Sequence, residues 1–84
     1  MTYTYATSGT CSKQIDFELD GNIIKAVAFT GGCHGNLQGI SKLVEGMTAE
    51  EAIKRLRGIR CGSKVTSCPD QLAVALEAAL EKQQ

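Results

Sequence analysis

The first third of the chain alternates between apolar and polar residues, which is the pattern of β-strands with one buried face. The alternation is clearest in the second such segment, where the apolar positions are Ile15, Phe17 and Leu19. Residues 2–7 are rich in threonine and tyrosine and predict a short strand at a sheet edge. The sequence Asp-Gly-Asn at residues 20–22 is typical of a tight turn, so we expect a third strand over residues 23–30 that returns antiparallel to the second.

From Asn36 onward, the apolar residues recur at the spacing of an α-helix. Asn36 is expected to cap a first helix that ends at Gly46. The predicted buried face of this helix consists of Leu37, Ile40, Leu43 and Val44. Thr48 and Glu51 form a capping box, which predicts a second helix that ends at Gly58.

Residues 66–70, Thr-Ser-Cys-Pro-Asp, are expected to begin the last helix. Proline has no amide hydrogen and fits the first helical position, so Cys68 becomes the predicted N-cap. The predicted buried face consists of Leu72, Leu76, Ala79 and Leu80, and the predicted outer face includes Gln71, Glu77, Glu81 and Lys82. Three strands followed by three helices predict an α+β fold, in which the helices pack on one face of a three-stranded antiparallel sheet.

The composition is that of a single small domain, residues 1–84, with no net charge. Nine basic and nine acidic residues cancel, so no long-range field is present to attract nucleic acid or an anionic membrane. No segment approaches the roughly 20 apolar residues that span a bilayer, and the N-terminus lacks the pattern of a signal peptide. We therefore expect a cytoplasmic protein that binds neither nucleic acid nor membrane.

Four cysteines are many for so short a chain, and in a reducing cytoplasm they indicate metal binding or redox chemistry rather than structural disulfides. Because the third strand returns to the start of the second, we expect Cys33 to lie near Cys11. The loop at residues 59–65 should likewise bring Cys61 to Cys68 at the start of the last helix. Four thiolates at one end of the sheet suit a tetrahedral Zn²⁺ or, as the alternative, an iron–sulfur cluster.

The cysteine spacing leaves other assignments open, because no two cysteines have the C-x-x-C spacing of zinc ribbons. His34 is an alternative fourth ligand in place of Cys61. Cys61 and Cys68 are an alternative redox pair that forms a disulfide. The four thiols could also be unrelated structural residues.

The sequence matches no enzyme template, since it lacks a Ser/His/Asp set, a P-loop and a complete dinucleotide-binding motif. Residues 31–35, Gly-Gly-Cys-His-Gly, are similar to a phosphate-binding turn but lack its third glycine and its later acidic residue. A nucleotide-binding regulatory module is therefore only an alternative. Four thiolates around Zn²⁺ leave no open coordination position, which argues against hydrolytic catalysis.

Residues 66–70, preceded by Gly-Cys-His-Gly-Asn at residues 32–36 and by Cys61-Gly62, resemble the TSCPD domain family, particularly its small stand-alone members with four cysteines. Related domains occur at the C-terminal end of adenosylcobalamin-dependent ribonucleotide reductases. The resemblance therefore implies an accessory or partner-binding role in deoxynucleotide synthesis and DNA replication, with ribonucleotide reductase as the partner. It does not imply that this chain reduces nucleotides, because that chemistry needs a large barrel domain with its own cysteines and cobalamin site.

A more distant resemblance is to the scaffold proteins on which iron–sulfur clusters are assembled. The matching positions are Cys11, Cys33, Cys68 and residues 46–51. Lys13 stands where the scaffolds carry an aspartate, and Ser67 stands where they carry a histidine. The resemblance implies a scaffold-like fold, and the additional Cys61 implies that metal is held more tightly than on a scaffold that releases its cluster.

Overall fold

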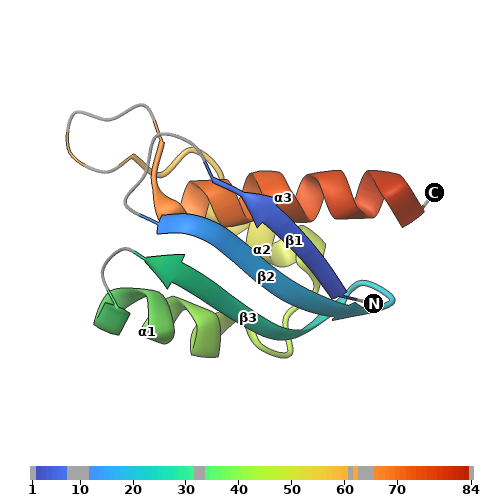
Figure 1. Cartoon of the computed structure of the whole chain (residues 1–84). Coiled ribbons are helices and arrows are strands. Elements are labelled where there is room, and N and C mark those ends of the chain that lie inside the picture. The colour runs from blue at the N-terminus through green and yellow to red at the C-terminus, as the bar shows by residue number, and fades with distance from the viewer. Residues whose placement is uncertain (1, 8–11, 32–33, 61, 63–65, 84) are drawn as a thin grey trace.

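Three strands are followed along the chain by three helices, as Figure 1 shows. The elements are β1 (Thr2–Ala6), β2 (Ser12–Asp20), β3 (Ile23–Gly31), α1 (His34–Val44), α2 (Ala49–Leu56) and α3 (Cys68–Gln83). This computed structural model describes residues 2–7, 12–31, 34–60, 62 and 66–83. The α+β fold class expected from the sequence is confirmed. In the described part of the chain, no helix has both the length and the apolar composition required to cross a bilayer.

The strands form one antiparallel sheet in the order β1-β2-β3. Phe17 of the central strand pairs with Tyr3 on one side and with Val27 on the other. The rings of Tyr3 and Phe17 are stacked, with their centroids 5.3 Å apart. The turn between β2 and β3 contains Gly21 at φ 62°, a left-handed conformation that favours glycine. The antiparallel return predicted from residues 20–22 is therefore confirmed.

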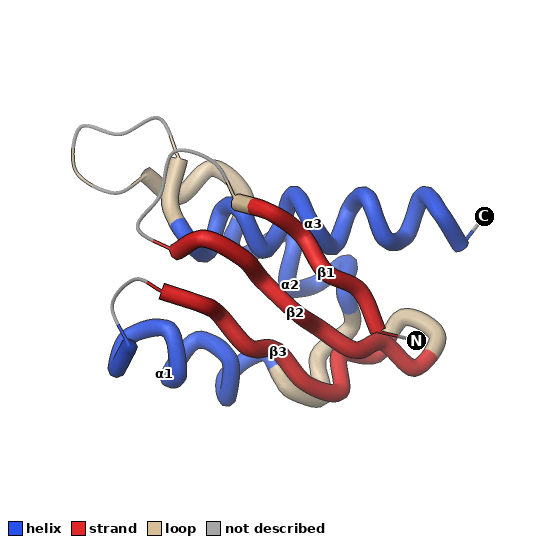
Figure 2. The backbone as a smooth tube through the Cα atoms, viewed as in Figure 1, coloured by secondary structure: helices blue, strands red, loops and turns tan. Residues whose placement is uncertain are grey.

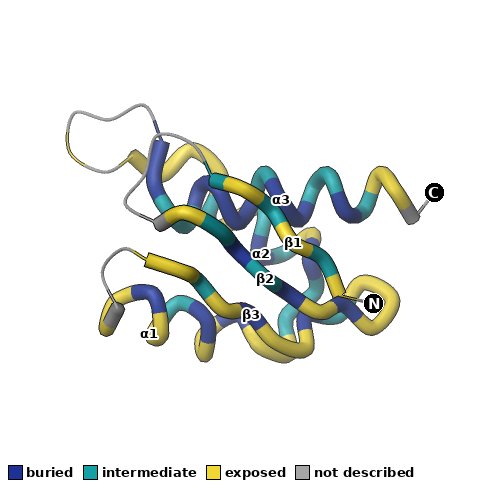
Figure 3. The backbone as a smooth tube through the Cα atoms, in the orientation of Figure 1, coloured by how far each residue is buried: buried dark blue, intermediate teal, exposed yellow. Residues whose placement is uncertain are grey.

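The helices cover one face of the sheet. Figure 2 shows α2 and α3 behind the sheet and α1 along the edge formed by β3. The hydrophobic core consists of Ile15, Phe17, Leu19, Ile24, Val27, Val44, Ala49, Ala52, Leu72, Ala75, Leu76 and Ala79. Strand residues such as Glu18 and Ala28, which alternate with the core positions, are exposed (Figure 3). A buried face on β2 and β3, and a partly buried face on β1, thus explain the alternating sequence pattern.

The second helix begins as the sequence predicts, whereas the first does not. The Glu51 backbone N–H donates to Thr48 Oγ1 over 3.1 Å, which is the N-cap bond of a capping box. Gly58 follows the helix with φ 89°, the conformation that commonly ends a helix at glycine. Only two residues separate β3 from α1, so the chain becomes helical at His34, before it reaches Asn36. The prediction that Asn36 caps this helix is therefore wrong.

The buried face of α1 also differs from the predicted one. Leu37, Ser41 and Val44 are buried, whereas Leu43 is 78% exposed. Spacings of four and three residues place the three buried positions on one helical face, and Leu43 lies outside that face. The Ser41 hydroxyl donates to the Leu37 carbonyl oxygen over 2.9 Å, which allows a polar residue to occupy a buried position. The prediction that Leu43 is buried is therefore wrong.

Replacing Leu76 by alanine should destabilise the domain far more than the same replacement at Leu43. The Leu76 side chain is fully buried, so its truncation leaves a cavity and should cost about 2–5 kcal/mol in the free energy of unfolding. Truncation of the exposed Leu43 side chain should change that free energy by less than about 0.5 kcal/mol. Urea denaturation followed by circular dichroism measures both values, and equal losses in the two variants would contradict the observed core.

Candidate functional site

The carboxylate of Asp70, in the first turn of α3, is the centre of a buried polar cluster. Its Oδ1 accepts a hydrogen bond from the Gly58 backbone N–H over 2.7 Å, and its Oδ2 accepts one from the Thr66 hydroxyl over 2.5 Å. Arg57 Nη1 lies 3.5 Å from Oδ1. The Asp70 side chain is only 8% exposed. These bonds connect the chain that leaves α2 with the chain that enters α3.

Ser67 connects the same two segments and also caps α3. The Asp70 N–H donates to Ser67 Oγ over 3.2 Å, and the Gln71 N–H donates to the Ser67 carbonyl oxygen over 2.8 Å. Ser67 Oγ itself donates to the Ile59 carbonyl oxygen over 2.6 Å. Bonds of this kind define an N-cap residue, so the prediction that Cys68 is the N-cap is wrong. A hydroxyl oxygen is a stronger hydrogen-bond acceptor than a thiol sulfur, which explains why the serine takes this position.

Gln71 is buried, although the helical pattern places it on the outer face of α3. Its Nε2 donates to Thr66 Oγ1 over 3.1 Å. The hydroxyl of Thr66 thus accepts from Gln71 while it donates to Asp70. The prediction that Gln71 faces solvent is wrong, because the chain before α3 covers the first turn of the helix at this point.

Arg57 extends the cluster along α3. Its Nε lies 2.7 Å from Glu77 Oε1, while its Nη1 reaches Asp70. One guanidinium therefore bridges two carboxylates of the same helix. The Arg57 side chain is half-exposed, so solvent weakens these ion pairs, and the hydrogen bonds to the buried Asp70 carry more of the stability.

The surroundings of Asp70 lower the pKa of its carboxyl group below the ordinary value of 3.8. The hydrogen bond from Thr66 has the largest effect. The Gly58 N–H and the Arg57 guanidinium lower the pKa further, against the opposing effect of burial. Asp70 is therefore held as a carboxylate whose oxygens are already engaged, which suits a structural acceptor rather than a general base.

Of the four predicted metal ligands, only Cys68 lies among the described residues. It is the first residue of α3 and is half-buried. Cys11, Cys33 and Cys61 lie outside the described residues, and His34 begins α1. Within the described ranges, no group of three or more histidine, cysteine, aspartate or glutamate side chains is placed to hold a metal ion. The four-cysteine site and the Cys61–Cys68 redox pair both stay predictions.

The described neighbours of these cysteines gather at one end of the sheet. Ser12, directly after Cys11, pairs with Gly31, which precedes Cys33 by two residues. Figure 1 shows that α1 and α3 both begin at this end, where β2 also begins and β3 ends. Segments that are far apart in the sequence therefore start or finish in the same region.

Thr66, Ser67 and Asp70 are residues of the site that the sequence reasoning missed. A signal for two of them was present, since Ser67 and Asp70 have the [ST]-x-x-[DE] spacing of a helix start. That spacing indicates a cap, but it gives no sign of the bond between Asp70 and Gly58, which lies twelve residues earlier. Only the folded chain shows that the carboxylate joins two helices.

Replacing Asp70 by asparagine should lower the free energy of unfolding by about 1–3 kcal/mol, because the change replaces a buried acceptor oxygen by an amide. The exposed Glu81 lies on the same helix, and Glu81→Gln removes one negative charge without breaking a buried bond. This control should change the unfolding free energy by less than about 0.5 kcal/mol. Urea denaturation at neutral pH measures both variants, and an unaltered Asp70→Asn protein would show that the cluster does not join the helices.

The pH dependence of the same variant provides a separate test. Because the pKa of Asp70 is lower in the folded protein, the unfolded chain binds more protons between the folded and unfolded pKa values. The stabilisation by the carboxylate is therefore complete above pH 3.8 and is lost as the pH falls through the folded pKa. The Arg57 guanidinium that faces Asp70 also contacts Glu77. The difference in unfolding free energy between wild type and Asp70→Asn should shrink on acidification, and growth of that difference would contradict the assignment.

A model of the TSCPD domain family matches residues 1–80 of the 84-residue chain. The match covers the sheet, α1, α2 and most of α3, together with the polar cluster at residues 66–70. Searches of curated proteins and of solved structures gave no match. Since the family match extends over nearly the whole chain, the protein belongs to the TSCPD domain family.

Proposed function

We propose that this TSCPD domain is a small metal-binding protein in which Cys11, Cys33, Cys61 and Cys68 hold one Zn²⁺. Four thiolates form a closed tetrahedral site of the structural type. The binding energy of such a site contributes to the stability of the fold, because the unfolded chain does not present the ligands together. The metal would serve as a fixed structural centre and would not catalyse hydrolysis.

The pairing of Ser12 with Gly31 is the observation that supports this proposal most directly. It brings the chain just after Cys11 beside the chain just before Cys33. The helix that carries Cys68 at its first position begins at the same end of the sheet (Figure 1). This arrangement supports a shared site for ligands whose sequence spacing alone is uninformative.

The polar cluster around Asp70 supports the proposal in a second way. The hydrogen bonds from Gly58 and Thr66 to Asp70 hold the start of α3 in place, as does the bond from Ser67 to Ile59. These bonds need no metal. Ligands on an element that is already positioned bind metal more tightly than ligands on a mobile chain. Cys68 is the first residue of α3, so it would be held in position before the metal binds.

A role connected with ribonucleotide reductase is the cellular context that we propose. It rests on the family resemblance, since related domains occur at the C-terminal end of adenosylcobalamin-dependent ribonucleotide reductases. A chain of 84 residues is too small to enclose a large cofactor and radical chemistry of its own. The domain would therefore act as an accessory or partner-binding protein in deoxynucleotide synthesis. A reducing cytoplasm suits this role, because disulfides do not compete there with metal for the thiols.

Replacing Cys68 by serine should reduce the zinc content of anaerobically purified protein well below one ion per chain and lower its melting temperature. Ser67→Ala is the matched control, because it removes the cap bonds of the same helix but keeps all four thiols. This control should lose about 1 kcal/mol of stability and retain its zinc. Elemental analysis by mass spectrometry and thermal unfolding give the two readouts.

Each outcome of the metal analysis has a distinct meaning. Full zinc occupancy in Cys68→Ser would refute Cys68 as a ligand. If the wild-type protein is brown and contains iron, the bound group is an iron–sulfur cluster and not zinc. A metal-free protein with four titratable thiols would refute the metal site. Loss of zinc in His34→Ala but not in Cys61→Ser would make His34 the fourth ligand.

A further inference from the structure

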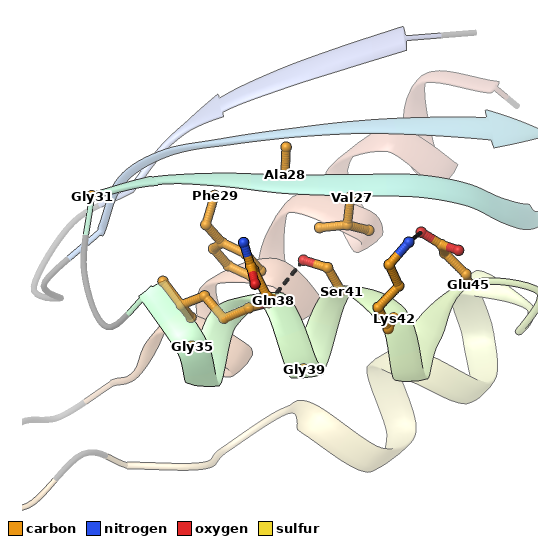
Figure 4. Close-up of a pocket in the computed structure, with 11 residues that line it drawn as sticks. Val27, Ala28, Phe29, Gly31, Gly35, Gln38, Gly39, Ser41, Lys42 and Glu45 are labelled. Carbon is orange, nitrogen blue, oxygen red and sulfur yellow. Dashed lines mark hydrogen bonds and ion pairs between the residues drawn. The ribbon is translucent and has the colours of Figure 1, made fainter.

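The two edges of the sheet differ in how the chain itself covers them. At the β3 edge, the Ile24 N–H donates to the Met47 carbonyl oxygen over 2.9 Å, and the Gly46 N–H donates to the Ile24 carbonyl oxygen over 2.8 Å. Helix α1 lies along this edge, and Figure 4 shows Val27 and Phe29 pointing from β3 toward the helix. A groove of about 620 Å³ is left between the two elements. The β3 edge is therefore already occupied by the protein itself.

Strand β1 forms the other edge, and no segment among the described residues pairs with its outer side. The Thr7 N–H donates to the Lys13 carbonyl oxygen over 3.1 Å, so these two residues form a hydrogen-bonded pair of the antiparallel ladder. Such pairs recur at every second residue, which means that Tyr5 and Tyr3 also direct their backbone groups toward β2. The residues whose backbone N–H and C=O groups point away from the sheet are Thr2, Thr4 and Ala6.

The β1 edge lacks the features that commonly keep a strand edge from pairing. Charged side chains, prolines and bulges on an edge strand hinder association with another strand. The sequence contains no charged residue and no proline before Lys13, and threonine and tyrosine favour extended backbone. β1 also pairs with β2 in an unbroken register, whereas the register shifts occur between β2 and β3. The edge is thus regular, uncharged and suited to bond another strand.

We propose that this edge binds a second copy of the protein, through antiparallel pairing of the two β1 strands across a two-fold axis at Thr4. In this register Thr4 pairs with Thr4 of the partner subunit, and Thr2 pairs with Ala6 of the partner subunit. Each of these pairs exchanges two backbone hydrogen bonds, so every outward-pointing group of β1 is used. The two three-stranded sheets would join into one continuous antiparallel sheet.

The side chains of β1 suit such a pairing on both faces of the joined sheet. Tyr3 and Tyr5 are half-buried on the helix side, where both pack against the core. In the proposed register each Tyr3 lies opposite Tyr5 of the partner subunit, in the non-hydrogen-bonded pairs that bring side chains closest together. Aromatic pairs across two strands stabilise a sheet. On the other face, Thr4 lies opposite Thr4 of the partner subunit, so no like charges meet.

The distribution of charge favours a second copy as the occupant. A two-fold contact places the same surface on both sides, so a charged edge would repel itself, and this edge carries no charge along residues 2–7. The nearest carboxylates on the exposed face belong to Asp16 and Glu18 of β2. Those of Asp16 would lie three strand spacings apart, roughly 14 Å, which exceeds the screening length of about 8 Å at physiological salt. A charged segment of another protein would find no counter-charge on this edge.

Sedimentation velocity of the full-length protein, from micromolar to millimolar concentration, tests the proposal under reducing conditions that exclude disulfide-linked dimers. The paired strands are short, so we expect a dimer that exchanges with the monomer and is populated at high concentration. Thr4→Lys places two ammonium groups against each other at the two-fold axis and should weaken dimerisation by about tenfold or more. Within one chain the new side chain faces Asp16, the pairing partner of Thr4, so the fold should be retained.

Ala28→Lys is the matched control. Ala28 is exposed and pairs with the same Asp16, but it does so from β3, on the side of the sheet away from the β1 edge. The control therefore adds the same charge beside the same carboxylate and should dimerise as the wild type does. Equal dimerisation of Thr4→Lys and wild type, or equal weakening by both lysine variants, would overturn the proposal.

Nuclear magnetic resonance of the wild type locates the contact without any substitution, so the test stands even if Thr4→Lys fails to fold. Hydrogen exchange at the amides of Thr2, Thr4 and Ala6 should slow as the dimer forms. An isotope-filtered experiment should connect the Hα atom of Tyr3 with that of Tyr5 of the partner subunit, because these atoms face each other in a non-hydrogen-bonded pair. A protein that stays monomeric at millimolar concentration, or a dimer whose three β1 amides stay unprotected, would overturn the proposal. None of these readouts measures zinc, so the cysteine site keeps its own test.

Discussion

The arrangement of α2 and α3 depends on one buried carboxylate, that of Asp70. Gly58, which follows α2, and Thr66, which precedes α3, both donate hydrogen bonds to it. A buried carboxylate that loses its donors is costly, so both segments have to stay in place while Asp70 is ionised. Ser67 strengthens the same connection through its bond to the Ile59 carbonyl oxygen. These bonds therefore position the start of α3 at one end of the sheet without the help of a bound ligand.

Most of the fold could be predicted because its signals are local. The alternation in the second strand, the Asp-Gly-Asn turn and the Thr48 cap each depend on residues that are close in sequence, and all three are observed. Leu43 and Gln71 were predicted wrongly because burial on a helix depends on what covers it. Ser41 occupies the buried position of α1 through a bond to its own helix, and Thr66 covers the first turn of α3. Such contacts between elements leave little trace in a periodic pattern.

In the candidate site, contacts between different elements are even harder to predict from the sequence. The spacing of Ser67 and Asp70 marks a helix start, but the partner of the carboxylate comes from another element. The cysteines lack the short spacing that identifies a zinc site from sequence, so their assignment rests on the order of strands and helices. The register that pairs Ser12 with Gly31 supports that order. The ligand set itself stays a prediction.

A zinc site at the end of the sheet would stabilise a fold whose core is limited by its length. The helix α1 begins at the end of the sheet where the cysteine neighbours gather, and it then forms one wall of the groove beside β3.

The central claim is that this end of the sheet gathers four thiolates around one zinc ion. Zinc K-edge X-ray absorption on the anaerobically purified wild-type protein tests it directly, since the method reports the type, number and distance of the ligands. The result that we predict is a single shell of four sulfur atoms at about 2.3 Å. A shell that contains nitrogen or oxygen at about 2.0–2.1 Å, or a protein without zinc, would contradict the claim.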